Sequence, residues 1–432
     1  MFARRRQKFR EAMGPDAVAL LIGGRMVTRS NDTEFPFRQD SDFGYLTGFH
    51  HPEAIAVLRT DGGPAFTLFV QPRELEAETW TGYRPGVEGA RSDYAADSSY
   101  PISEFSKELP NIVQKVRRIY HMLGRNRGVD EHLVQILEDM RRRSRQGSIP
   151  ASEIIDPRAI LHEMRLFKEP EELDSMRRAA EITAMAHREA AKLAHEGRHE
   201  YELEAVLDYT FRRLGATGPA YTSIVGGGAN ATTLHYIAND QPLRNGDLVL
   251  IDAGAEYEGY AADVTRTYPV GGHMEGAGRD VYEVVLAAQE AGLALAKPGS
   301  TLDAVHQAAL SRLVEGLVDL GLLSGSVDDL IEAGEYRRYY MHRTSHWLGL
   351  DVHDVGNYAR EDRPRPLEPG MAFTVEPGLY IANSIEDEAA SLFRGIGVRI
   401  EDDVIITESG HENLNSAIPK NPSEVEAWVG GD

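Results

Sequence analysis

The amino-acid sequence predicts a protein of the α/β (α+β) class that is built from two domains. The chain has 432 residues, which is more than one ordinary hydrophobic core accommodates. Hydrophobic residues make up 42% and charged residues 26% of the chain, the balance of a globular protein. Short apolar runs alternate with helical patterns throughout, and the pattern changes near residue 170.

Residues 1–170 are predicted to form an α/β domain. The runs AVALLIGG (17–24) and IAVL (55–58) are typical of buried strands, and EHLVQILEDMRRRSRQ (131–146) has the spacing of an amphipathic helix. No glycine-rich phosphate-binding motif follows these strands in the sequence, so we predict no nucleotide site there.

Residues 171–432 are predicted to form the second domain. A helix should begin at Glu169-Pro170, where proline and acidic residues suit the first turn, and end at Gly197. The strands that follow are rich in Val, Ile, Tyr and Thr and form apparent hairpins, which predicts a largely antiparallel sheet covered by helices on one face. The other long helices are expected at 201–215, 280–296 and 303–321.

Composition excludes several functional classes. The formal net charge is −22, from 68 acidic and 46 basic residues, so a nucleic-acid partner is not expected. The two short basic runs, Arg4 to Arg6 and Arg141 to Arg145, are interpreted as solvated helix faces. The sequence has no cysteine, which fits a cytoplasmic protein and leaves carboxylates and imidazoles as metal ligands. No apolar run approaches the ~18–20 residues of a membrane span, so no membrane partner is expected.

The stretch LVLIDAGAEYEGYAADVTRTYPV carries the first candidate metal ligands. Two strand-like runs flank Glu256 to Gly259, a plausible hairpin loop. If the turn is centred on Tyr257 and Glu258, Asp252 and Asp263 lie directly opposite each other on one face. A cation between them would relieve their repulsion. The alternative from these residues alone is one Asp in a turn and the other in a salt bridge.

Three later residues extend the set. His346 lies in MHRTSHWLGLDVHDVG, Glu376 ends an apolar strand before a Pro-Gly turn, and Glu401 falls in the Val/Ile-rich strand GIGVRIEDDVIIT. An acid in an apolar strand is costly unless it is paired or ligated. Each acid alone fits a salt bridge, and the lone histidine fits a structural hydrogen bond. Together the five residues predict an oxygen-rich site for two divalent ions bridged by carboxylates.

Four catalytic-domain motifs, an N-terminal segment and a junction segment resemble the pita-bread-fold metallopeptidases, and aminopeptidase P (the Xaa-Pro aminopeptidases) most closely. The resemblance implies a creatinase/prolidase-like domain at 1–170, for oligomerisation and substrate access, and a pita-bread catalytic domain with covering helices at 171–432. The matching segments are GYAADVTRTYPV, SHWLGLDVHDVG, TVEPGLYI, RIEDDVIIT, TRSNDTEFPFRQDSDFGYLTGF and HEMRLFKEPEELDSMRRAAEITAMAH.

The same resemblance implies how the ligands are used. Asp252 would chelate one metal, Asp263 and Glu401 would bridge both, and His346 and Glu376 would complete one ion. A hydroxide held by the two metals would attack the scissile carbonyl, with Glu376 as proton shuttle. Ligands dominated by oxygen favour Mn²⁺ as the activating ion.

Other residues match the family's substrate site. His235 and His353 would hydrogen-bond near the scissile amide, and His342 would line the proline pocket. Arg399 and Tyr380 are candidate supporting residues, although an ordinary ion pair and simple packing also explain them. Two further residues, Asp32 and Trp80, resemble segments that reach a neighbouring subunit, which predicts a homotetramer or homodimer. Arg343 is less typical of the family and would alter the lining of the substrate pocket.

The sequence therefore predicts a proline-specific metalloaminopeptidase that releases the residue before a penultimate proline. The nearest alternative is prolidase, which shares the site but cleaves Xaa-Pro dipeptides. A non-catalytic peptide-binding or protein-binding module and a metal-free hydrolase such as creatinase use the same fold. The retention of all five ligand residues argues against both of these.

Overall fold

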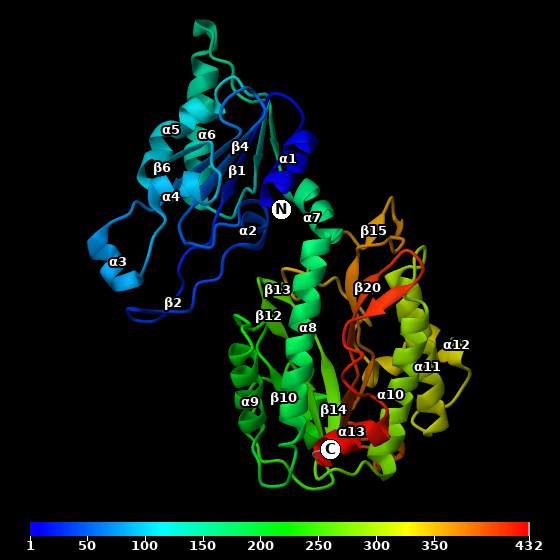
Figure 1. Ribbon diagram of the computed structural model, residues 1–432. Helices are drawn as coiled ribbons and strands as arrows, with labels where there is room; N and C mark the ends of the chain where they lie inside the picture. The colour runs from blue at the N-terminus through cyan, green and yellow to red at the C-terminus, as the bar shows by residue number, and fades with distance from the viewer. Residues whose placement is uncertain (431–432) are drawn as a thin grey trace. The chain divides into compact units, whose positions relative to one another are not determined.

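The computed structural model describes residues 1–430 and divides into two compact units, Met1–Met164 and a second that begins at Arg165 (Figure 1). The sequence predicts this boundary near residue 170. Both units combine helices with sheets, and the predicted α/β (α+β) class is confirmed.

The first unit is built on a six-stranded mixed sheet with the order β6-β5-β4-β1-β7-β8. The two predicted strands lie at its centre, β1 (Ala17–Ile22) antiparallel to β4 (Ile55–Arg59). The other strands of this sheet are β5 (Phe66–Val70), β6 (Ser98–Pro101), β7 (Arg118–His121) and β8 (Glu153–Ile155). Strands β2 (Thr28–Ser30) and β3 (Thr33–Glu34) form a separate two-stranded sheet. The helices of the first unit are α1 (Phe2–Met13), α2 (Ser41–Thr47), α3 (Leu75–Thr81), α4 (Gly86–Ser92), α5 (Phe105–Val113) and α6 (Arg127–Arg142). Helix α7 (Arg158–Leu166) includes the boundary at Met164.

The sequence predicts that both basic runs are solvated helix faces, and for the run from Arg4 to Arg6 this prediction is wrong. Arg5 and Arg6 of α1 are buried, with guanidinium groups 4.0 Å from the ring centroids of Tyr45 and Phe66. Cation–π contact and hydrogen bonds to the carbonyls of Tyr45 and Leu46 replace hydration. The run from Arg141 to Arg145 is exposed, as predicted.

The second unit contains small antiparallel sheets, which confirms the predicted antiparallel arrangement. Its strands are β9 (Gly218–Pro219), β10 (Ile224–Gly227), β11 (Leu248–Asp252), β12 (Ala255–Tyr257), β13 (Tyr260–Ala261), β14 (Thr265–Pro269), β15 (Ala359–Arg360), β16 (Arg363–Pro364), β17 (Ala372–Val375), β18 (Gly378–Ile381), β19 (Ile396–Arg399), β20 (Asp402–Ile406) and β21 (His411–Asn413). Its helices are α8 (Pro170–Ala191), α9 (Glu200–Arg213), α10 (Gly276–Ala294), α11 (Leu302–Asp319), α12 (Val327–Ala333) and α13 (Pro422–Gly430).

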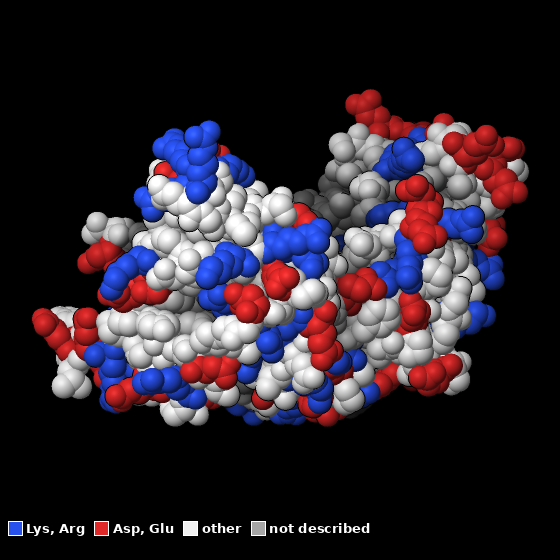
Figure 2. Space-filling view, turned by 90° about the horizontal axis from the view of Figure 1, so that it is seen from above, with Lys and Arg blue, Asp and Glu red and all other residues white. Residues whose placement is uncertain are grey.

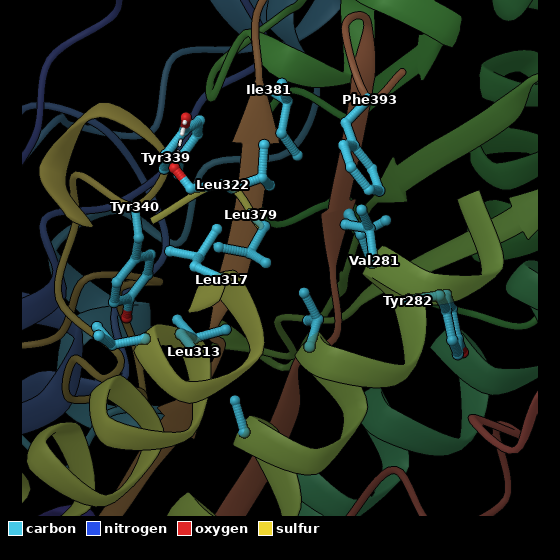
Figure 3. Packing of buried hydrophobic residues seen from close by; sticks show 14 of the residues in the cluster. Val281, Tyr282, Leu313, Leu317, Leu322, Tyr339, Tyr340, Leu379, Ile381 and Phe393 are labelled. Atoms are coloured by element: carbon cyan, nitrogen blue, oxygen red, sulfur yellow. Dashed lines mark hydrogen bonds between the residues drawn. The ribbon is translucent and has the colours of Figure 1, made fainter. Parts of the chain in front are cut away.

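Helix α8 begins where the sequence predicts, because Glu169 and Glu172 form a reciprocal capping box and Pro170 occupies the first helical position. Helices α8 and α9 pack together, as do α10 and α11 (Figure 1). Figure 3 shows the core between helices and sheet, where Leu313 and Leu317 of α11 lie beside Leu379 of β18. The burial of these large apolar side chains fixes the strands that carry the site.

The predicted register of the Asp252 hairpin is wrong. Tyr257 pairs with Tyr260, so the turn consists of Glu258 and Gly259, whose φ angles are 51° and 85°. Two consecutive positive φ angles are typical of a type I′ hairpin turn. The register therefore shifts by two residues, and Asp252 pairs with Thr265 instead of Asp263.

Acidic and basic side chains are interspersed over the face shown in Figure 2. None of the helices formed by residues 1–430 combines the length and the apolar character of a membrane span.

Candidate metal centre

The second unit contains a cavity of about 840 Å³ that gathers most of the predicted site residues. Its volume is within the range of small-ligand sites, about 300–1,000 Å³. Tyr380 is buried behind it, whereas Asp32 and Trp80 belong to the first unit. The predicted residues in the cavity lining are Asp252, Asp263, His346, Glu376, Glu401, His235, His342, His353 and Arg399.

All four cavity carboxylates lie at ends or interruptions of strands. Asp252 is the last residue of β11, Asp263 lies between β13 and β14, and Glu376 lies between β17 and β18. Glu401 was predicted inside a strand, but it lies at the break between β19 and β20. At Gly254 the chain approaches itself so closely that a Cβ atom would lie 1.7 Å from the Ala262 carbonyl oxygen. Such irregularities turn side chains away from the strand alternation and direct them towards one point.

Tyr221 links Asp252 and Asp263, the two aspartates that do not face each other across the hairpin as predicted. The Tyr221 hydroxyl lies 2.5 Å from Oδ1 of Asp252 and 2.5 Å from Oδ1 of Asp263. A hydroxyl has one hydrogen to donate, so it cannot satisfy two carboxylates. The guanidinium of Arg399 is the second donor to Asp252, at 2.5 Å.

Burial raises the pKa of three of these carboxyl groups. The pKa of Asp252 is raised by burial, and that of Glu376 is raised by burial to about 7. The pKa of Glu401 is raised well above its usual range by burial and by the neighbouring charges of Asp263 and Glu376. These groups resist ionisation together, which is the electrostatic condition that bound cations relieve.

His346 is held with one ring nitrogen directed at the carboxylates. Its Nδ1 lies 3.0 Å from the carbonyl oxygen of Trp347, while Nε2 lies 3.3 Å from Asp263 and 3.5 Å from Glu376. Burial lowers the pKa of His346, but its hydrogen bond to Asp263 and the nearby carboxylate charges outweigh burial and raise the pKa to about 9. Nε2 therefore lies where it binds either a proton or a metal ion.

The donor set fits divalent metal. Asp263, His346 and Glu401 offer ligand atoms that all lie within 4.8 Å of one another. Oxygen donors with one imidazole suit hard or borderline divalent ions. We conclude that the cavity has the composition and the charge imbalance of a metal site.

Arg399 connects the metal site to supporting residues. Its guanidinium donates to Asp252 at 2.5 Å, to Thr265 at 3.0 Å and to Tyr380 at 3.0 Å. The Thr265 hydroxyl in turn donates to Glu401 at 2.6 Å. The contact of Arg399 with Glu401 thus runs through Thr265, and Asp252 is its direct carboxylate partner.

The three further histidines differ in their surroundings. His342 is half-buried against Tyr380, with Nε2 2.8 Å from the hydroxyl, and desolvation lowers its pKa to about 3. His353 is exposed and its ring lies edge-on to that of His346, with centroids 4.4 Å apart. His235 is exposed in the loop after β10.

Buried Glu200 anchors that loop. It accepts hydrogen bonds from the backbone amides of Gly227 and Gln241, from the Asn230 amide and from the Tyr236 hydroxyl.

Sequence reasoning missed three site residues, Tyr221, Thr265 and His306. Tyr221 precedes β10, which reaches the site because Ile224 pairs with Asp252. That pairing is distant in sequence, so no local signal identifies Tyr221. Thr265 was detectable in principle as the residue that faces Asp252 in the correct register.

Comparisons with known proteins agree with this geometry. Residues 174–408 match the description "Metallopeptidase family M24", and residues 2–120 match "Aminopeptidase P, N-terminal domain". The chain is 47% identical to the Xaa-Pro aminopeptidase of Escherichia coli (strain K12), over 99% of this chain and 97% of that protein. It is 33% identical to the Xaa-Pro aminopeptidase 3 of Homo sapiens, over 96% of this chain and 81% of that protein.

Solved structures give the same result. The aminopeptidase PepP of Pseudomonas aeruginosa superposes with a TM-score of 0.96 at 44% identity, over 100% of this chain and 97% of that one. The chain belongs to metallopeptidase family M24, with the pita-bread fold in its second unit.

Proposed function

We propose that the cavity binds two divalent metal ions and removes the N-terminal residue from peptides whose second residue is proline. The chain is a Xaa-Pro aminopeptidase, in agreement with its relatives of that name. The observation that carries the metal assignment is the group of four cavity carboxylates, for which Arg399 is the one buried arginine or lysine of the described lining. The pKa values of Asp252, Glu376 and Glu401 are raised in spite of it. A non-catalytic module would have no use for that imbalance.

The metal ligands in this proposal would be the five predicted residues, Asp252, Asp263, His346, Glu376 and Glu401, which all line the cavity. Three of them, Asp263, His346 and Glu401, offer ligand atoms within 4.8 Å of one another. When bound, divalent ions supply an activated water and polarise the scissile carbonyl. The oxygen-rich donor set supports Mn²⁺ as the activating ion.

Glu376 is the proposed proton carrier. Its carboxylate lines the cavity and lies 3.5 Å from Nε2 of His346, where it would accept a proton from the attacking water and return it to the departing proline nitrogen. His342, which is half-buried in the cavity lining, contributes to the pocket for the proline ring. The exposed imidazoles of His235 and His353 face the cavity and donate to the peptide backbone beside the scissile bond.

Arg399 and Tyr380 act as positioning residues in this scheme. The fully buried guanidinium fixes Asp252 directly and Glu401 through Thr265. Because its hydrogen bonds are directed to both sides of the site, Arg399 preserves the spacing of the ligands.

The direct experiment follows products from Ala-Pro-Ala and Ala-Pro after treatment with EDTA and restoration of Mn²⁺. We expect manganese-dependent release of alanine, faster from the tripeptide and lost in Asp263→Asn. Cleavage of the dipeptide alone would identify a prolidase. Activity with Zn²⁺ or Co²⁺ and none with Mn²⁺ would contradict the metal assignment.

We also propose that the enzyme is cytoplasmic and forms a homotetramer or homodimer in which Asp32 and Trp80 reach a neighbouring subunit's cavity. The exposure of helix α3 supports the contact with a neighbouring subunit, because none of its residues is buried and Trp80 is 84% exposed. Light scattering would give the oligomeric state. Loss of tripeptide cleavage in Trp80→Ala, with assembly intact, would support the shared site.

A further inference from the structure

Arg343 is a positively charged side chain at the mouth of the cavity. Among the described residues of the lining, only Arg343 and Arg399 are arginine or lysine. Arg399 is buried and committed to Asp252, Thr265 and Tyr380. The Arg343 side chain is 62% exposed, so it is the cation that an entering peptide meets.

The surroundings of Arg343 hold its backbone but leave its charge accessible. Its carbonyl oxygen lies 2.8 Å from Nδ1 of His342, which places the residue beside the proposed proline pocket. Its Nη2 donates to Oδ1 of Asp303, in the first turn of α11, at 2.7 Å. Exposed pairs of this kind contribute only about 0–1 kcal/mol, so Asp303 does not prevent a second carboxylate from binding.

The substrate of this enzyme has one charged group at each end. The carboxylate-rich metal site suits the positively charged amino terminus, while the rest of the peptide leads away from it. A short peptide then carries a carboxylate beyond the proline, either its own C-terminus or an acidic side chain. Arginine recognises carboxylates through its planar array of N–H donors.

We propose that Arg343 binds a carboxylate of the peptide on the C-terminal side of proline, and thereby determines which substrates are preferred. This inference depends on the proposed function. The recognised chemistry is a single carboxylate, and substrate pairs distinguish its two possible sources.

The test compares two substrate pairs with the full-length, Mn²⁺-loaded enzyme. Ala-Pro-Ala against Ala-Pro-Ala-NH₂ reports on the C-terminal carboxylate, and Ala-Pro-Asp-NH₂ against Ala-Pro-Asn-NH₂ reports on an acidic side chain. In at least one of the two pairs, we expect kcat/KM to be about tenfold higher for the peptide that carries the carboxylate than for its neutral partner, mainly through a lower KM. Arg343→Gln should reduce that ratio to within about twofold, and Arg343→Lys should retain an intermediate ratio.

Two more variants sharpen the result. Asp303→Asn removes the competing carboxylate and should raise the ratio. Arg312→Gln is the matched control, because Arg312 is an exposed, ion-paired arginine of helix α11, which also carries Asp303, and it is not part of the cavity lining. The ratio of kcat/KM between acid and neutral substrate in this variant should equal that of the wild type. Equal rates within both pairs for the wild type, or a preference that survives Arg343→Gln, would overturn the proposal. Failure to cleave any of the four peptides would instead refute the proposed function.

Discussion

Asp402 and Glu401 are buried carboxylates joined by one peptide bond, and within residues 1–430 the protein supplies two cations to Asp402 but none directly to Glu401. Asp402 is fully buried, and Arg266 and Lys420 donate to it at 2.6 Å each, with further bonds from Gln289 and Asn413. Burial raises the pKa of Asp402, but the charges of Arg266 and Lys420 outweigh burial and lower it well below the usual range. This carboxylate is stably ionised by its own protein.

The neighbouring Glu401 faces the other way. Glu401 lies close to the carboxylates of Asp252, Asp263 and Glu376. Among the described residues of the cavity lining, Arg399 is the one buried arginine or lysine. The pKa of Glu401 is raised well above the usual range by burial and neighbouring negative charge. A buried carboxylate matched by protein cations supports the fold, whereas an unmatched group reserves a place for a cation.

The largest expected effect is catalytic. Asp263→Asn should lower kcat/KM for Ala-Pro-Ala by about 10⁴-fold, or about 5.5 kcal/mol, because a neutral amide removes the proposed bridging ligand. Circular dichroism should show an unchanged fold. Activity within tenfold of the wild type under saturating Mn²⁺ would remove Asp263 from the proposed site.

The matched group should show the opposite behaviour. Asp402→Asn leaves the charge of buried Arg266 uncompensated and should lower the free energy of unfolding by about 3–5 kcal/mol. Denaturant titration measures this loss. If the variant is as stable as the wild type but inactive, the two groups do not differ in the way inferred from their charges.

Metal removal sharpens the contrast. At a free Mn²⁺ concentration of 100 times Kd, each bound ion should stabilise the protein by about 2.7 kcal/mol relative to an EDTA-treated sample. The melting temperature should therefore rise on addition of Mn²⁺. The increase should persist in a protein whose exposed Arg312 is replaced by Gln and be smaller in Asp263→Asn.

A smaller effect concerns a buried group whose partners are neutral. His187 lies 3.1 Å from the Ala253 carbonyl and 3.2 Å from the Tyr268 hydroxyl, and burial lowers its pKa from 6.5 to about 4. The unfolded chain then binds more protons below pH 6.5, so stability is lost as pH falls from 6.5 towards 4. Between pH 7.5 and pH 5 this group should account for about 2 kcal/mol.

The check compares urea unfolding of wild type and His187→Gln at both pH values in EDTA. Glutamine retains a donor and an acceptor but does not titrate, so the variant should lose less stability on acidification. An identical loss in both proteins would show that His187 does not carry this pH dependence.

Much of this site was accessible from sequence because its chemistry conflicts with its surroundings. Glu376 and Glu401 are conspicuous in apolar stretches, and the motifs around His346 and Asp263 supplied the family. The register was missed because Glu258 adopts a positive φ angle that the sequence does not reveal. Tyr221 was missed because its contact depends on pairing between β10 and β11, and the burial of Arg5 depends on an aromatic ring 40 residues away.

The most direct test of the unmatched-carboxylate account is metal stoichiometry measured by equilibrium dialysis against Mn²⁺. We expect two ions per chain in the wild type, two in folded Asp402→Asn, and fewer in Asp263→Asn. Two ions retained by Asp263→Asn, or none bound by the wild type, would contradict it.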